Sequence, residues 1–201
     1  MNIAVYLILS YLIGNINPAY IISKVKGFDI RQKGTGNAGA SNITLVLGKK
    51  AGIITALFDI FKAFAVTFAA IKIFPDISIA GIAAGSACIL GHIFPVFMKF
   101  KGGKGLASLG GMILAYNPLI FLILITTELL IIVFFNYISL VAPTGSVLFA
   151  VTYAFTDGDI KGIILLSAIA LIIILKHIPN FRRIADGTEK KISILWKKEN
   201  K

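Results

Sequence analysis

The sequence predicts an all-α integral membrane protein with about seven transmembrane helices, some of them short. Three observations lead to this class. First, 57% of the 201 residues are hydrophobic and only 14% are charged, whereas about a quarter of a typical soluble domain is charged. Second, residues 119–155 carry one formally charged side chain, Glu128. Third, the basic residues, which bring the net charge to +11, mostly flank apolar segments.

Seven apolar runs define the predicted helices. A helix that crosses the hydrocarbon core needs about 20 residues at about 1.5 Å per residue. The run 106–116 is too short to cross alone, so we expect a tilted short span or a re-entrant piece. Asn117-Pro118 separates it from the next run because a proline disfavours helical geometry in the preceding residue; five crossings remain if 106–135 is one irregular hairpin. The runs occupy residues 3–23, 51–74, 77–98, 106–116, 118–135, 138–156 and 162–177.

Individual runs carry further signals. The run 3–23 has no basic segment before it and no small-residue cleavage pattern, so we expect a retained first span and no signal peptide. The run 51–74 contains Asp59 and Lys62 at spacing i, i+3, which are expected to neutralise each other. Glu128 has no evident partner in the sequence, so a polar contact between helices and a proton relay are both open.

The distribution of Lys and Arg predicts the orientation. Seventeen of the 20 basic residues lie in or beside three segments, the loops 24–50 and 99–105 and the tail 177–201. The positive-inside rule places these segments in the cytoplasm, with the N-terminus outside and the C-terminus inside. We expect a single polytopic membrane domain over residues 1–201. Because the basic residues flank spans, topology and anionic ligands explain the charge better than nucleic acid does, and no nucleic-acid partner is expected.

The loop at residues 33–42, KGTGNAGASN, combines small and polar residues. Small residues let backbone N–H groups approach a ligand closely, and successive N–H groups form nests that hold anions. A flexible polar loop, or small residues that allow close helix packing, is the alternative interpretation. The candidate substrate-binding residues are Thr35, Gly36, Asn37, Gly39, Ser41 and Asn42.

The second loop, KFKGGKGLAS at residues 99–108, surrounds one ammonium group with glycines at the start of an apolar segment. The N-terminus of a helix favours phosphate, so Lys104 is the candidate catalytic cation. The loop is not a nucleotide-binding P-loop, because Lys104 is followed by glycine instead of Ser or Thr and the leading glycine spacing is missing. The candidate binding residues are Gly102, Gly103 and Gly105.

The third segment is KHIPNFRRIADGTEKK at residues 176–191. His177, Asn180 and Arg183 are spaced i, i+3, i+6, which aligns them on one face if the helix continues. If a new helix starts there instead, Pro179 is tolerated at its first position and resets the direction of the chain. His177 and Asn180 are candidate catalytic residues and Arg183 a candidate binding residue, although His177 as an ordinary interfacial residue is equally open.

Cysteine and histidine usage limits the possible chemistry. The single cysteine, Cys88, excludes a disulfide framework and a cysteine-rich metal site. His92 and His177 are far apart and lack HExxH-type spacing, so no metal site is expected. No nucleophile is paired with a base in the sequence, so a covalent acyl-enzyme is not expected.

Four stretches, in order along essentially the whole chain, resemble motifs of the bacterial membrane acyl-phosphate:glycerol-3-phosphate acyltransferases: GTGNAGASN, FDIFKA, GHIFPVFMKFKGGKG and KHIPNFRRIADGTE. The resemblance implies a seven-helix monomer in the bacterial plasma (inner) membrane, with its active site facing the cytoplasm. It implies transfer of a fatty acyl group from acyl phosphate to glycerol-3-phosphate in phospholipid biosynthesis, giving lysophosphatidic acid. It also implies no cofactor, no metal and no direct use of acyl-CoA or acyl carrier protein. Ser139 and Glu189 join the binding candidates through this resemblance.

The sequence departs from the family pattern at several positions. Thr35 and Ser41 exchange serine and threonine and keep the hydroxyl groups. Leu45 stands where the family usually has an arginine, and Ala142 where it usually has a serine. Losing a bidentate phosphate donor is not conservative, so recognition of the acceptor phosphate is the feature most affected. Two alternatives stay open: a transporter of a small phosphorylated anion, and a weakened paralogue that binds lipid precursors.

Overall fold

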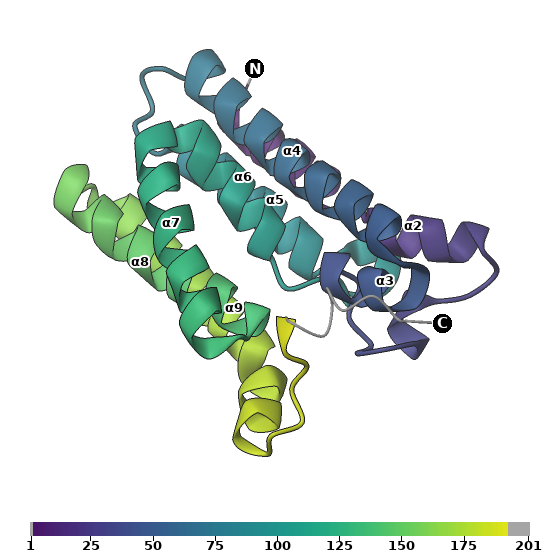
Figure 1. The fold of residues 1–201 in the computed structure, drawn as a ribbon. Coiled ribbons are helices and arrows are strands. Elements are labelled where there is room, and N and C mark those ends of the chain that lie inside the picture. Colours follow the sequence, from purple (N-terminus) through teal and green to yellow (C-terminus); the bar gives the residue numbers. More distant parts are fainter. Residues whose placement is uncertain (1, 193–201) are drawn as a thin grey trace.

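The structure, a computed structural model, describes residues 2–192, and within them the chain is helical with no strand (Figure 1). The predicted basic tail is therefore followed only to Ile192, and Lys197, Lys198 and Lys201 lie outside the described residues. Three 3-10 helices, η1 (Ile30–Gln32), η2 (Val96–Met98) and η3 (Ile138–Leu140), join the longer elements. The α-helices are α1 (Ile3–Gly14), α2 (Pro18–Val25), α3 (Ala40–Leu47), α4 (Lys49–Ile73), α5 (Ala80–Ile93), α6 (Leu106–Tyr116), α7 (Pro118–Phe135), α8 (Val141–Thr156) and α9 (Ile160–Ala185).

The predicted all-α membrane class is confirmed. Within the described residues, five helical segments are long and apolar enough to cross a membrane, and α1 with α2 makes a sixth if that bent pair counts as one span. The helix α6, with 11 residues, is shorter than a span. All seven predicted apolar runs contain helices at the expected places, while the number of full crossings and the orientation of the termini stay predictions.

The first run, predicted as one span, is a bent pair of helices. The chain bends by 42° between α1 and α2. The reason is local: Asn17 caps the new helix by accepting a hydrogen bond from the Tyr20 backbone at 2.9 Å, and Pro18 occupies its first position. Lys62 donates to the carbonyl groups of Gly14 (3.0 Å) and Ile16 (2.8 Å) at the break. The break therefore has its polar groups satisfied by α4.

The sequence left open whether the helix continues through Pro179 or a new helix starts there, and the structure shows that it continues. The helix α9 runs without interruption from Ile160 to Ala185 and contains Pro179 in its interior. A proline inside a helix removes one backbone hydrogen bond, but here His177 and Asn180 on either side of it are buried, at 3% and 6% exposure. Packing of this face outweighs the local preference, because tertiary contacts commonly override propensity. His177, Asn180 and Arg183 consequently share one helical face.

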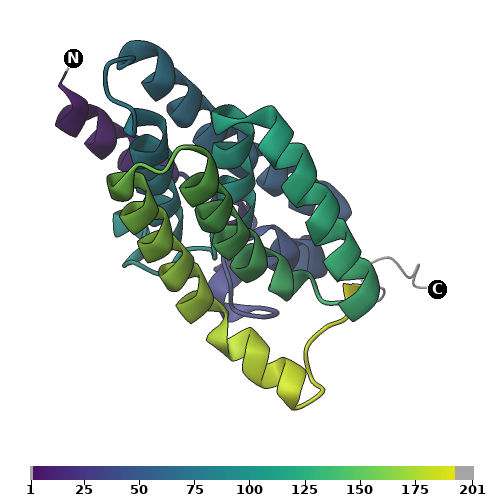
Figure 2. The same cartoon turned by 90° about the vertical axis from the view of Figure 1, so that its left-hand side faces the viewer.

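Close helix packing builds the interior. The views in Figures 1 and 2 show α4 beside α5 and α6, while α8 and α9 pair on the other side. The main core cluster includes Met112, Phe149 and Ile173 from α6, α8 and α9. A Cβ at Gly111 would overlap the backbone of Ile60, so glycine permits the close approach of α6 and α4. The predicted loops emerge at one end of this bundle.

Candidate active site

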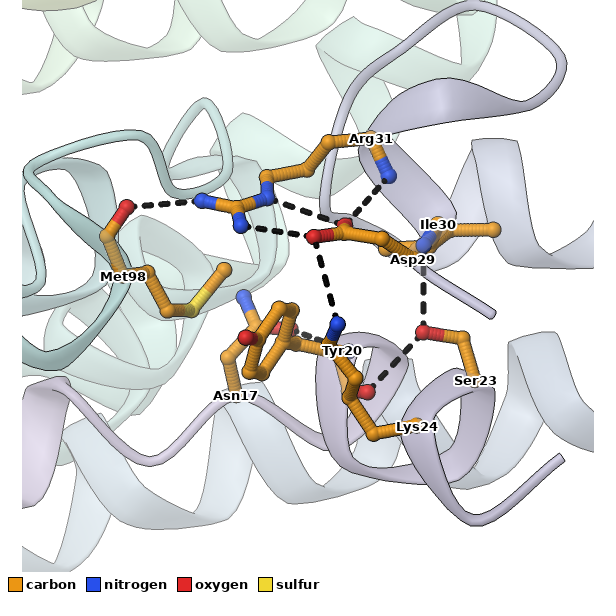
Figure 3. Close-up of polar contacts among 8 residues, drawn as sticks. All are labelled: Asn17, Tyr20, Ser23, Lys24, Asp29, Ile30, Arg31 and Met98. Atoms are coloured by element: carbon orange, nitrogen blue, oxygen red, sulfur yellow. Dashed lines mark hydrogen bonds and ion pairs between the residues drawn. The ribbon is translucent and has the colours of Figure 1, made fainter. Parts of the chain in front are cut away.

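Arg31 holds the first and second loops together (Figure 3). Its Nε and Nη2 atoms donate to the Asp29 carboxylate at 2.9 and 2.7 Å, and its Nη1 atom donates to the Met98 carbonyl at 2.7 Å. This ion pair lowers the pKa of Asp29 to about 2, although burial opposes the shift. The loop that follows α2 is thereby fixed to the turn that precedes Lys104.

Asn42 shapes the loop 33–42 from within. Its Oδ1 accepts a hydrogen bond from the Thr35 backbone at 2.7 Å, and its Nδ2 donates to the carbonyls of Lys33 (3.0 Å) and Asn37 (2.9 Å). Asn42 is 1% exposed, so these bonds are made in a buried setting where each unsatisfied group would be costly. The small residues of the loop are thus held as a defined backbone shape.

The three predicted segments meet around one cavity of about 230 Å³. The first loop lines it together with the glycine loop, the turn before α8, the helix α9 and residues 189–190 just beyond it. The cavity is also lined by Leu45, the position of the missing arginine. The predicted site residues that line it are Thr35, Asn37, Gly39, Ser41, Asn42, Lys104, Gly105, Ser139, His177, Asn180 and Glu189.

Four predicted site residues lie outside this cavity. Gly36 and Gly102 line a separate cavity on the other side of the first loop. Gly103 packs against His92, since a Cβ at Gly103 would overlap the imidazole ring. Arg183 pairs with Glu189 at 2.7 Å, so it contacts a residue that lines the cavity.

A continuous chain of polar contacts crosses the cavity wall. Lys104 donates its Nζ proton to the Asn180 Oδ1 atom. Asn180 Nδ2 donates to Glu189 Oε1 at 2.6 Å, and Arg183 Nε donates to Glu189 Oε2 at 2.7 Å. The second and third segments are therefore coupled through side chains, and Lys104 is held in place by α9.

Burial and neighbouring charges shift the pKa values of Lys104 and Glu189 in this network of polar contacts. Burial lowers the pKa of Lys104 to about 8, an effect that Arg183 reinforces and Glu189 opposes. Burial raises the pKa of Glu189, but hydrogen bonds from Asn180 and Arg183 outweigh it, so the pKa lies below its usual value. At neutral pH the site therefore contains a protonated Lys104 and an ionised Glu189.

His177 has the arrangement of a potential base. Its Nδ1 atom lies 2.8 Å from the Ile173 carbonyl. With the proton on Nδ1, this contact is a hydrogen bond and leaves the Nε2 lone pair free to accept a proton. His177 also lines the cavity, as a base acting on a bound substrate would need to.

Asp59, Lys62 and His92 form a buried cluster beside the cavity, of which the sequence predicted only the pair Asp59 and Lys62. The Asp59 and Lys62 side chains pair at 2.7 Å, as their spacing predicted. His92 also joins the pair, with Nδ1 3.3 Å from Asp59 Oδ1, and both Asp59 and His92 line the cavity. Two quoted motifs, FDIFKA and GHIFP, contain these residues, but the contact joins α4 to α5 and sequence spacing carries no signal for it.

The sequence left the role of Glu128 open between a polar contact and a proton relay. Glu128 accepts hydrogen bonds from Thr144 Oγ1 at 2.8 and 2.9 Å, which makes it a polar contact between α7 and α8.

Among residues 2–192, no three His, Cys, Asp or Glu side chains are grouped as metal ligands would be. The polar side chains that line the cavity are those of lysine, histidine, carboxylate, carboxamide and hydroxyl residues, among them Lys104, Asn180 and Glu189.

The chain is similar in both sequence and structure to glycerol-3-phosphate acyltransferases. The glycerol-3-phosphate acyltransferase family model matches residues 4–187. Glycerol-3-phosphate acyltransferases of Macrococcus caseolyticus and Bacillus subtilis are 41% and 37% identical, covering 96% and 97% of this chain and 98% and 100% of their own lengths. The crystal structure of PlsY, an integral membrane glycerol 3-phosphate acyltransferase in its glycerol 3-phosphate form, superimposes with a TM-score of 0.89 at 32% identity. That match covers 97% of this chain and 99% of the other.

Proposed function

The chain belongs to the glycerol-3-phosphate acyltransferase family, and from this premise we propose that it transfers a fatty acyl group from acyl phosphate to glycerol-3-phosphate. The products are lysophosphatidic acid and phosphate. The observation that carries the proposal is the single cavity in which Lys104, His177 and the loop 33–42 meet. We further propose a monomer of seven crossings in the bacterial inner membrane, with residues 24–50, 99–105 and 177–201 on the cytoplasmic side.

An apolar pocket beside the cavity supports a lipid substrate. Its volume is about 210 Å³, and it shares the residues Ala40, Ser41, Ala56 and Ile138 with the cavity. A phosphorylated group and an acyl chain therefore fit on adjoining surfaces. Apolar lining with a few placed polar groups is the usual composition of a ligand site.

The chemistry follows from the charge of the two substrates. The acceptor hydroxyl oxygen forms a bond to the acyl carbonyl carbon, and the bond from that carbon to the phosphate oxygen breaks. Phosphate leaves with both bonding electrons, and the hydroxyl proton passes to His177 Nε2 or to a substrate phosphate oxygen. Lys104 and the loop N–H groups neutralise the phosphate and the developing oxyanion. Holding the acceptor hydroxyl against the acyl carbonyl, despite the repulsion between the two anions, is the kind of positioning that contributes up to about 7–11 kcal/mol in well-oriented reactions.

A product assay tests the proposal. Purified protein is incubated with acyl phosphate and glycerol-3-phosphate, with dihydroxyacetone phosphate as a competing acceptor, and lysophosphatidic acid is measured. Formation of lysophosphatidic acid supports the reaction, and preferential use of dihydroxyacetone phosphate would reassign the acceptor. Uptake of a phosphorylated anion into sealed proteoliposomes without any acylated product would identify a transporter instead.

The pKa of Lys104 predicts how activity depends on pH. Because the ammonium form is needed to neutralise phosphate and the pKa in the free protein is about 8, kcat/KM is expected to fall as pH rises through about 8. Lys104→Arg keeps its charge in this range, so its residual activity is expected to decline only at higher pH. Initial rates between pH 6 and 10 measure both profiles, and identical basic limbs would remove Lys104 as their origin.

Leu45 provides a second prediction. It lines the cavity without offering a hydrogen-bond donor. Leu45→Arg is expected to lower the apparent KM for glycerol-3-phosphate severalfold, since an arginine adds a bidentate phosphate donor. Leu45→Met is the matched control and is expected to leave KM unchanged. A KM that is unchanged or raised in Leu45→Arg would show that other residues bind the acceptor phosphate.

A further inference from the structure

A second polar cavity lies on the other side of the first loop. Its volume is about 360 Å³, and it shares no lining residue with the candidate active site. It contains two glycines that the motifs singled out but the active-site cavity does not use, Gly36 and Gly102. Its charged lining residues are Asp29, Arg31, Lys99 and Lys101.

The lining of this cavity carries a net positive charge. Asp29 is its one carboxylate and is already paired with Arg31 at 2.7 Å. The donors of Arg31 are directed to Asp29 and to the Met98 carbonyl (Figure 3). The ammonium groups of Lys99 and Lys101 have no ion-pair partner among the described residues, and both side chains are exposed. Two cations are therefore available to an incoming anion.

Exposed apolar side chains alternate with these lysines. Phe97 and Phe100 are 77% and 56% exposed, and Val96 is 43% exposed. In a membrane protein, exposed aromatic residues beside lysines are typical of the interface between headgroups and hydrocarbon. A soluble anion would gain nothing from these apolar neighbours, whereas a lipid offers a phosphate and a hydrocarbon surface together.

The backbone of the turn is held in an unfavourable conformation. Lys99 and Phe100 have φ angles of 54° and 59°, in the left-handed region that bulky residues rarely adopt. Hydrogen bonds from Phe100 N to the Pro95 carbonyl (3.0 Å) and from Lys101 N to the Met98 carbonyl (3.2 Å) maintain this shape. Strain of this kind persists where surrounding contacts enforce it, commonly at binding sites.

We propose that this cavity binds the phosphate of an anionic phospholipid headgroup, with Lys99 and Lys101 as the phosphate ligands. Phe97 and Phe100 insert into the adjoining membrane interface. The site is separate from acyl transfer, but Arg31 links it to the Met98 turn that precedes Lys104. A bound lipid therefore stabilises the arrangement of the two loops.

Lipid retention by the full chain tests this site. The protein is purified in neutral detergent, mixed with equal amounts of phosphatidylglycerol and phosphatidylcholine, and analysed by native mass spectrometry. Wild type is expected to retain phosphatidylglycerol preferentially. In the variant Lys99→Gln/Lys101→Gln, the preference for phosphatidylglycerol is expected to fall roughly 25-fold at low ionic strength, about fivefold for each lysine. The control Lys72→Gln/Lys161→Gln removes the same charge at the other end of α4 and α9 and is expected to keep the preference.

Two further measurements distinguish binding of a lipid from binding of a free anion. Phe97→Ser/Phe100→Ser is expected to weaken lipid retention while both lysines remain. Inorganic phosphate at millimolar concentration is expected not to displace the lipid. An unchanged preference in the lysine variant would overturn the site, and displacement by phosphate with no effect of the phenylalanine changes would reassign it to a soluble anion. These readouts involve no catalysis, so they do not depend on the outcome of the acyl-transfer assay.

Discussion

Lys104→Ala is expected to lower kcat/KM for acyl transfer by about 100-fold or more. Lys104 is the cation that the glycine loop brings into the cavity, and its Nζ contacts Asn180 on α9. The phosphate and the developing oxyanion would lose their nearest compensating charge, and removal of one such group typically costs about 10²–10³-fold in rate. The measurement is lysophosphatidic acid formation by purified protein in detergent.

The control for this variant lies in the same loop. Lys101→Ala removes an identical charge three positions earlier, outside the cavity. In detergent without anionic lipid, we expect its kcat/KM to remain within about threefold of wild type. Retention of a tenth or more of the wild-type activity by Lys104→Ala would contradict the role of this lysine in neutralising phosphate.

Asp59→Leu is expected to reduce the free energy of unfolding by about 3–5 kcal/mol. Asp59 is 1% exposed and lies 2.7 Å from Lys62 and 3.3 Å from His92. Without the carboxylate, a buried ammonium group loses its counter-charge, and removing one partner of a buried pair costs much more than replacing both. Thermal unfolding in detergent, followed by loss of the folded peak in size-exclusion chromatography, reports the effect as a lower apparent Tm.

Two variants distinguish charge imbalance from loss of packing. Asp59→Leu/Lys62→Leu is expected to recover part of the stability, because no uncompensated charge remains; the loss of the bonds from Lys62 to Gly14 and Ile16 prevents full recovery. Glu128→Gln removes a buried carboxylate that has a hydroxyl partner, Thr144, and is expected to change stability much less. Equal destabilisation by Asp59→Leu and Glu128→Gln would argue against the ion-pair explanation.

The candidate site was largely predictable because its residues lie in short motifs. Thr35, Lys104 and His177 each belong to a distinct stretch, and their chemistry is evident from residue type. The exceptions are positions where backbone direction decides the outcome. Gly36 turns away from Gly39 at a φ of 75° and lines the other cavity. Gly103 packs against His92, where a Cβ would overlap the imidazole ring.

For the helices as well, their positions were predictable from the sequence, whereas their bends and continuations were not. Apolar runs located the helices because burial in hydrocarbon depends on composition, which is a local property. The bend after Gly14 was not predicted, and the continuation of α9 through Pro179 was left open. The bend is stabilised by Lys62 from another helix, and the continuation by burial of His177 and Asn180, so both depend on contacts between distant segments.

By itself the sequence determined the membrane class, the places of the helices, the three polar segments and the family resemblance, because hydropathy and motif residues act at short range. Only the tertiary structure decided that Lys104 contacts Asn180, that Asp59 meets His92, and that the glycine-rich loops border two cavities instead of one. The physical reason is that these contacts join residues dozens of positions apart. Their geometry depends on how the helices bend and pack, which no single stretch of sequence specifies.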